Sequence, residues 1–196
     1  MRVFFAIPPD PDWVASVREL EGRLKVSLPR ASWTRPEAWH LTLKFLGEID
    51  QTAADRFAAA IDEVQASLAG AGALASAGSL VLPARGRPRV LAVGFAPSPA
   101  LESLATLARA AEQGGRRIGV PPEDRAFRPH LTLARLREPW LAHAIEAFRK
   151  ETDAWPFPPW RLRSCALFQS RLAPAGAVHT PLREWTFGER GAEVRA

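Results

Sequence analysis

Apolar side chains recur every three or four positions in four stretches of the chain, which predicts four amphipathic helices. The first begins at Asp10-Pro11, an N-cap acid followed by a proline suited to the first helical position. We expect the others to begin near Thr52, at Ser98-Pro99 and at Pro139, with the third ending at Gly114-Gly115. Their apolar positions are Val17, Leu20, Leu24 and Leu28; Phe57, Ile61, Val64 and Leu68; Leu101, Leu104, Ala108 and Ala111; and Leu141, Ile145 and Phe148.

Short apolar runs bounded by proline, glycine or charged residues lie between these helices and predict strands. The expected strands are 3–7, 41–46, 79–82, 90–95 and 131–136, followed by a closing pair at 161–168 and 178–187. Segment 66–78 is rich in alanine, glycine and serine, so we expect a helix end and a loop there. Segment 155–160 contains three prolines and is expected to be a stiff connector. The polar tail after Gly188 is expected to fray.

The order of these elements repeats along the chain. The tetrapeptide His-Leu-Thr-Leu occurs at 40–43 and again, 90 positions later, at 130–133. The two proline-started helices are 88 positions apart, as are Phe57 and Ile145 in the helices that follow the motifs. We therefore predict an α+β fold of two lobes, built from duplicated βαβαβ units, with antiparallel sheets lining a central cleft and helices outside. The expected organisation is a single domain over 1–196 with an internal repeat of roughly 1–85 and 86–190.

Composition narrows the class of protein. Of the 196 residues 47% are hydrophobic and 24% charged, which excludes disorder, collagen and coiled coil as descriptions of the whole chain. The first apolar run stops at Pro8-Pro9-Asp10 and is too short for a signal-peptide core or a membrane span, so we expect a cytoplasmic protein. The single cysteine, Cys165, excludes an internal disulfide and a thiolate metal cluster. A net charge of +5 permits an anionic partner such as nucleic acid.

The repeated motif carries the candidate chemistry. Alternation along a strand places His40 with Thr42, and His130 with Thr132, on the face opposite the motif leucines. If the lobes pack about a pseudo-twofold axis, the two polar faces meet in one cleft. Histidine titrates near neutrality, so one imidazole can act as base and the other as acid, as phosphodiester cleavage requires. The threonine hydroxyls can donate hydrogen bonds to phosphate oxygens. This scheme requires neither a metal nor a cofactor.

Other polar residues near the motifs are weighed by their spacing. Arg128 lies two residues before His130, so in a regular strand it shares that face and can bind a phosphate. Lys44 has the same relation to the first motif, but we expect it at the strand end in solvent, which makes it a weaker candidate. His143 and His179 have no such partners and are expected to be surface or packing residues.

Four segments, at 2–7, 39–48, 88–91 and 127–135, together resemble one known family. The chain resembles the two-histidine phosphoesterases and, among them, the RNA 2′,3′-cyclic phosphodiesterases, long called 2′-5′ RNA ligases. The resemblance covers nearly the whole chain, and two HxTx motifs with these flanks are highly specific. One departure lies near the C-terminus, where the family often carries a tyrosine after a glycine-containing turn. This chain has no tyrosine, and its Gly176 is followed by Ala-Val-His179-Thr.

The resemblance implies metal-independent hydrolysis of a 2′,3′-cyclic phosphate at an RNA 3′ end, giving a 2′-phosphomonoester. By family convention His40 would be the proton donor to the departing 3′ oxygen, and His130 the acceptor that activates water. Thr42, Thr132 and Arg128 would hold the phosphate. The expected partner is RNA with such an end, or a small cyclic nucleotide, and the protein is expected to be a monomer without a cofactor.

Two other functions remain open from the sequence. Ligation through a 2′-5′ linkage is the reverse reaction and could use the same groups. A non-catalytic RNA-binding or nucleotide-binding module would account for the basic charge, but it gives no reason for two histidines at matched positions.

Overall fold

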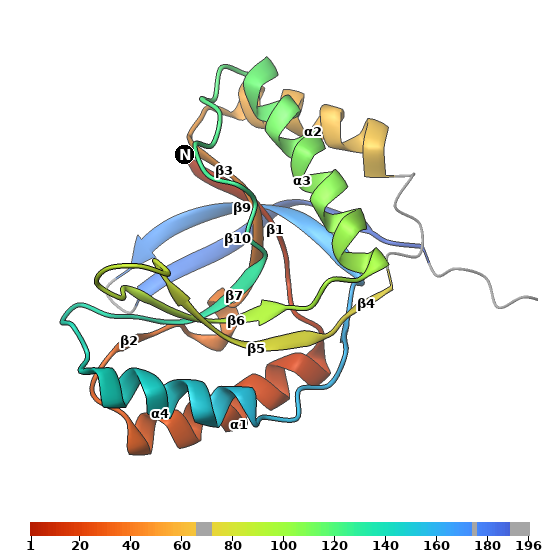
Figure 1. Ribbon diagram of the computed structural model, residues 1–196. Coiled ribbons are helices and arrows are strands. Elements are labelled where there is room, and N and C mark those ends of the chain that lie inside the picture. Colours follow the sequence, from red (N-terminus) through yellow and green to blue (C-terminus); the bar gives the residue numbers. More distant parts are fainter. Residues whose placement is uncertain (66–71, 174–175, 189–196) are drawn as a thin grey trace, which may run out of the picture.

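The computed structural model describes residues 1–65, 72–173 and 176–188, and it confirms the α+β class (Figure 1). Its elements are β1 (Arg2–Ile7), α1 (Pro11–Ser27), β2 (Ser32–Trp33), the 3₁₀ turn η1 (Pro36–Ala38), β3 (Leu41–Glu48), α2 (Gln51–Gln65), β4 (Ala73–Leu74), β5 (Ser76–Leu82), β6 (Val90–Phe95), α3 (Pro99–Arg117), β7 (His130–Arg135), α4 (Ala142–Asp153), β8 (Trp160–Arg161), β9 (Ser164–Ala173) and β10 (Gly176–Thr186). None of the helices in these ranges is long and apolar enough to cross a membrane.

The two motif strands lie in the middle of an antiparallel sheet. Its order is β10-β9-β1-β3-β7-β6-β5, with β2 paired to β7, while β4 and β8 form a separate two-stranded sheet. β3 and β7 pair at Leu41 and Leu131, which are the second residues of the two motifs. Both leucines are fully buried, as alternation within the motif predicts. This pairing joins the two parts of the sheet at the repeated sequence.

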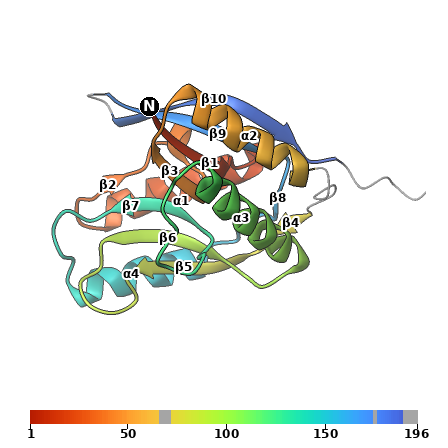
Figure 2. The same ribbon diagram turned by 90° about the horizontal axis from the view of Figure 1, so that it is seen from above.

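Strands and helices from each half of the sequence pack with elements from the other half of the sequence. β5 comes from the first half but pairs with β6, and β9 comes from the second half but pairs with β1. The helices exchange in the same way, because α3 packs against α2 and β3, whereas α4 packs against α1 and β5. Figure 1 shows α2 with α3 at one end of the molecule and α1 with α4 at the other, and Figure 2 shows the same arrangement from above. The spatial halves of the molecule are therefore not its sequence halves.

The start of α1 is fixed by capping and by aromatic packing. Asp10 accepts a hydrogen bond from the backbone N–H of Trp13 at 3.0 Å and another from the N–H of Arg161 at 2.6 Å. The buried Trp13 ring stacks on Phe157 at 4.9 Å, and its indole N–H donates to the Pro158 carbonyl at 2.6 Å. The proline-rich connector after α4 is thus held against α1.

The third helix is longer than the sequence predicted. α3 continues through Gly114 and Gly115 to Arg117, and the glycine with positive φ that follows it is Gly119. A Cβ built on Gly114 would lie 3.4 Å from the Phe57 ring of α2. The paired glycines therefore lie within the helix, packed against neighbouring elements, and do not end it.

Two other boundaries differ from the prediction. α4 begins at Ala142 and not at Pro139, and Leu141 is an exposed N-cap residue outside the apolar face. The segment expected to be a loop contains β4 and the start of β5, because β8 pairs with β4 and β6 pairs with β5 from Ser76 onward. The predictions for residues 66–71, which include Leu68, and for the tail after Gly188 fall outside the described residues.

Candidate active site

The two motif histidines are anchored in the same way. His40 lies directly before β3, and its Nδ1 bonds to the Ala38 carbonyl at 2.8 Å. His130 begins β7, and its Nδ1 bonds to the Arg128 carbonyl at 2.6 Å. In both cases the partner is the carbonyl two residues earlier. Because a carbonyl can only accept, each Nδ1 carries the hydrogen and each neutral ring keeps Nε2 available for proton transfer.

Burial makes both imidazoles weaker bases than free histidine. It lowers the pKa of His40 to about 4, even though the hydrogen bond to Ala38 opposes the shift. Nearby His179, His130 and Arg135 lower this pKa further. Burial also lowers the pKa of His130, with added effects of Arg135 and Arg128. Both rings are therefore neutral at pH 7 in the free protein, and an anion between them would favour protonation.

Each motif threonine follows its histidine by two residues, Thr42 on β3 and Thr132 on β7. Thr42 pairs with Ala6 of β1, and Thr132 pairs with Ala92 of β6. Both are partly exposed, in contrast to the buried leucines on either side of each. Neither hydroxyl has a hydrogen-bond partner within the described ranges. Both are thus free to donate to a phosphate in the same region as the imidazoles.

A β-bulge lies at the last residue of the motif in each of the two strands. Phe5 pairs with Lys44 but Ala6 pairs with Thr42, so one residue of β3 is extra. The same irregularity recurs in β7, where Thr132 and Ala134 face consecutive residues of β6. A bulge of this kind reverses the alternation of side chains beyond it. The repeat therefore extends to a backbone feature that period-two patterning does not reveal.

The bulges bring Phe45 and Arg135 to the motif face. The ring of Phe45, whose exposed fraction is 51%, lies 6.2 Å from that of Phe4, which in turn lies 4.7 Å from His40. Arg135 holds the equivalent place in β7, and its charge acts on both motif histidines. No ion pair or side-chain hydrogen bond of Arg135 occurs in the described part of the chain. Regular alternation would have placed both residues on the opposite face, which is why the sequence did not reveal them.

Lys44 is not at a strand end in solvent, as the sequence had suggested. Its side chain is only 2% exposed and forms ion pairs with Glu112 at 2.8 Å and Glu123 at 3.6 Å. Its ammonium also donates to the Pro121 carbonyl at 3.3 Å, and its hydrogen bond is the main cause of the lowered pKa of Glu112. The bulge turns Lys44 into the interior, where it ties α3 and the following loop to β3. It is therefore a structural residue and not a phosphate ligand.

Arg128 and His179 complete the surroundings of the motifs. Arg128 is exposed in the loop before β7, so its side-chain position is not fixed by strand alternation. His179 lies in β10, with its ring centroid 5.2 Å from His40 and 4.8 Å from Phe4. His179 is thus a packing residue, one of the two outcomes expected for it, but the ring it packs against is a motif histidine, and His143 is exposed on α4 as expected. The one sequence signal for His179 was its place near the family's usual tyrosine.

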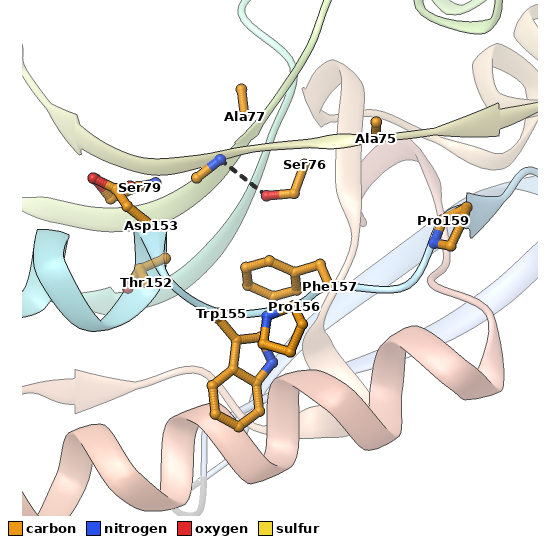
Figure 3. Close-up of a pocket in the computed structure, with 11 residues that line it drawn as sticks. Ala75, Ser76, Ala77, Ser79, Thr152, Asp153, Trp155, Pro156, Phe157 and Pro159 are labelled. Carbon is orange, nitrogen blue, oxygen red and sulfur yellow. Dashed lines mark hydrogen bonds between the residues drawn. The ribbon is translucent and has the colours of Figure 1, made fainter.

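A pocket of about 580 Å³ lies elsewhere, between β5, the end of α4 and the connector (Figure 3). Inside it, Gly78 donates its backbone N–H to Ser76 at 2.9 Å, and Ser79 donates to Asp153 at 2.6 Å. No motif residue lines this pocket, so it is separate from the paired histidines. Within 1–65, 72–173 and 176–188, no three His, Cys, Asp or Glu side chains are grouped to hold a metal ion.

Comparisons with known proteins agree over nearly the whole chain. The family model described as LigT like Phosphoesterase matches residues 7–91 and 95–179, one motif in each match. Several curated relatives carry the name RNA 2′,3′-cyclic phosphodiesterase. The one from Archaeoglobus fulgidus is 29% identical over 193 residues, covering 93% of this chain and 98% of the relative.

Solved structures share the fold. A crystal structure of a Thermus thermophilus protein superimposes with a TM-score of 0.71 at 25% identity, covering 97% of this chain and 100% of that one. The crystal structure of E. coli LigT with 3′-AMP gives a TM-score of 0.68 at 22% identity, covering 95% and 97% of the two chains.

Proposed function

Because the chain belongs to the LigT-like phosphoesterase family, we propose that it hydrolyses 2′,3′-cyclic phosphate ends of RNA to 2′-phosphomonoesters. The membership expected from the sequence is confirmed by the match in both halves. The curated relatives with that activity in their names span nearly the whole chain, which supports hydrolysis of a phosphodiester. The observation that carries the mechanism is the pair of identically anchored imidazoles on adjoining strands.

In the proposed reaction, water attacks the phosphorus of the cyclic phosphate while Nε2 of His130 accepts a proton from it. The bond from phosphorus to the 3′ oxygen breaks, and Nε2 of His40 gives its proton to that oxygen. Thr42, Thr132 and Arg128 hold the phosphate and stabilise its growing negative charge. The products are a 2′-phosphomonoester and a free 3′ hydroxyl. No step involves a metal or a cofactor.

His40 has to take up a proton before it can act as the acid, and the bound substrate favours that step. With a pKa of about 4, His40 is mostly neutral in the free protein near pH 7. A bound phosphate anion favours the charged imidazole and raises this pKa. The positive charge of Arg135 opposes that effect until phosphate neutralises it. Substrate binding therefore prepares the acid that the reaction consumes.

The substrate and setting follow from the same reasoning. We expect a nucleotide with a 2′,3′-cyclic phosphate or an RNA ending in one, in line with the 3′-AMP bound by E. coli LigT. All proposed groups belong to one chain, so the enzyme is expected to act as a monomer, and we place it in the cytoplasm. We treat 1–196 as a single two-lobed domain with repeats of roughly 1–85 and 86–190, each half matched once by the family model.

Replacing either motif histidine tests the function directly. His40→Ala and His130→Ala are each expected to reduce hydrolysis of a 2′,3′-cyclic nucleotide by about 10²–10⁴-fold, the usual contribution of one acid or base. Wild-type activity is expected to survive a chelator. The exposed His143 on α4 provides the control variant, His143→Ala, which should retain full activity. Normal turnover by either motif variant would contradict the proposal.

Ligation is tested with the same protein. Incubation with RNA halves that end in a 2′,3′-cyclic phosphate and a 5′ hydroxyl would reveal a 2′-5′ linked product. We expect hydrolysis to dominate, because water is in large excess over the second RNA end.

A further inference from the structure

The two motif histidines have unequal surroundings despite their matching anchors. The His40 ring lies 4.7 Å from Phe4 and 5.2 Å from His179, and the His40 and His179 planes meet at 74°. Phe4 and His179 also touch each other, at 4.8 Å and 70°. Each of these three rings therefore contacts the other two. His130 has its Nδ1 bond to Arg128 but no aromatic ring contact within the described residues.

The C-terminal hairpin carries His179 to this position. β9 pairs with β1, which sets Phe168 beside Phe4 with a stacked ring contact of 5.3 Å. β10 then pairs with β9, where His179 faces Ser170. The half-buried His179 ring has no hydrogen-bond partner in the ranges the structure describes, so packing alone holds it. A strand from the far end of the chain thus covers one side of the first motif.

We propose that His179 is a positioning residue for His40: together with Phe4 it fixes the plane of the His40 imidazole and makes the two motif histidines functionally unequal. A ring held by one hydrogen bond alone can swing about that bond. Contacts on two further sides remove this freedom and keep Nε2 aimed in one direction. Misplacement of a reacting group by about 1 Å can cost up to 10²-fold in rate. The effect on catalysis rests on the proposed function, whereas the effect on the ring does not.

His179 also affects the proton on His40. The charged or titratable groups that act on His40 are His179 from β10 and His130 and Arg135 from β7. β1 presents the Phe4 ring, and the 3₁₀ turn presents the Ala38 carbonyl, neither of which titrates. Burial lowers the pKa of His179, so this ring is mainly neutral at pH 7. A proton on His179 at low pH would disfavour one on His40.

The first experiment separates packing from charge by kinetics. His179→Ala is expected to lower kcat about tenfold or more, with KM changed less than about twofold, because the reacting ring is misplaced and binding is not lost. His179→Phe keeps an aromatic ring at this position and should recover most of the lost kcat. The acidic limb of its pH–rate profile should nevertheless move to higher pH. His143→Ala is the matched control. If His179→Ala keeps the wild-type kcat and pH profile, the proposal is overturned.

The second experiment needs no activity. ¹⁵N-labelled imidazole resonances of His40 are followed by NMR from pH 3 to 8 in wild type, His179→Phe and His143→Ala. We expect the His40 pKa to be higher in His179→Phe than in the other two proteins. An unchanged His40 titration would overturn the role of His179 in its protonation. If the shift occurs but wild type hydrolyses no cyclic phosphate, the proposed function fails while the ring contact stands.

Discussion

At the scale of single residues, the site depends on how neighbours alter two imidazoles. The meeting of the two motifs was predicted on the condition that the lobes pack about a pseudo-twofold axis, and the pairing of Leu41 with Leu131 agrees with it. Arg135 could not be predicted, since a bulge depends on backbone pairing and leaves no mark on hydrophobic alternation. His179 could not be predicted either, because its place depends on a hairpin packing against the first strand.

The pH dependence follows from the direction of the histidine shifts. One imidazole has to be neutral and the other protonated, so the reactive form of the free enzyme peaks between their two apparent pKa values. The pKa of His40 is lowered to about 4, and that of His130 is lowered from 6.5. The optimum of kcat/KM is therefore expected below pH 6.5. The optimum of kcat should lie at higher pH, because bound phosphate raises both values.

Steady-state rates on a 2′,3′-cyclic nucleotide across pH 4 to 9 would measure both profiles. A kcat/KM optimum well above neutrality would contradict the lowered pKa values of the free histidines.

Arg135 is expected to strengthen phosphate binding. Arg135→Gln should reduce kcat/KM by roughly 10- to 100-fold, since a hydrogen bond to a charged group is worth about 1.5–3 kcal/mol. The loss should shrink as salt is added, because screening weakens the wild-type contact. Arg137→Gln is the matched control, as Arg137 donates to Ser32 at 3.1 Å. Equal kinetics for Arg135→Gln and wild type at low salt would exclude this role.

At the scale of elements, the helix and strand types could be read from periodicity and caps, but glycine was ambiguous. A glycine pair can end a helix, or it can lie inside a helix where a neighbouring helix or strand approaches closely. The sequence of the pair is the same in both cases. In α3 the pair lies against Phe57 of α2 and Lys44 of β3, so tertiary contact decided the outcome. The end of a helix in such cases depends on packing that a single sequence does not contain.

Gly114 gives a stability test of this contact. A Cβ there would lie at ordinary contact distance, 3.4 Å from Ala60 and Phe57, so Gly114→Ala is expected to stabilise by up to about 1 kcal/mol through helix propensity. Gly114→Leu should destabilise by about 1–3 kcal/mol, because it overpacks the boundary between the helices. Urea unfolding measures both changes.

Gly22 of α1 provides the control, since a Cβ there would have nothing within 4 Å. Gly22→Leu should therefore not destabilise the protein. A stable Gly114→Leu variant would show that α2 and α3 are less closely packed than described.

At the scale of the whole molecule, the exchange of strands is the main feature that sequence reasoning missed. A repeat of strand, helix, strand, helix, strand has the same pattern whether its third strand pairs within its own half or with the other. Only the pairing of β5 with β6 and of β9 with β1 distinguishes these arrangements. The helices follow the strands, so each helix pair combines one helix from each half of the chain.

Cutting the chain between the repeats tests this interdependence. Fragments 1–85 and 86–196 are each expected to lack cooperative unfolding when produced alone, because β1 loses β9 and β6 loses β5. Co-expression should restore a cooperative transition and cyclic-phosphate hydrolysis. Circular dichroism during thermal unfolding measures the transition, and a cooperatively folded 1–85 fragment would contradict the exchange.

The pairing of β1 with β9 also bears on synthesis at the ribosome. The strand that covers one edge of β1 is translated roughly 160 residues after β1 itself. At about 5–20 residues per second, the nascent chain carries an open, apolar strand edge for roughly ten to thirty seconds. Such edges recruit other strands. Slow translation or pausing before the final hairpin should therefore favour aggregation of the growing chain, even though the finished protein conceals that edge.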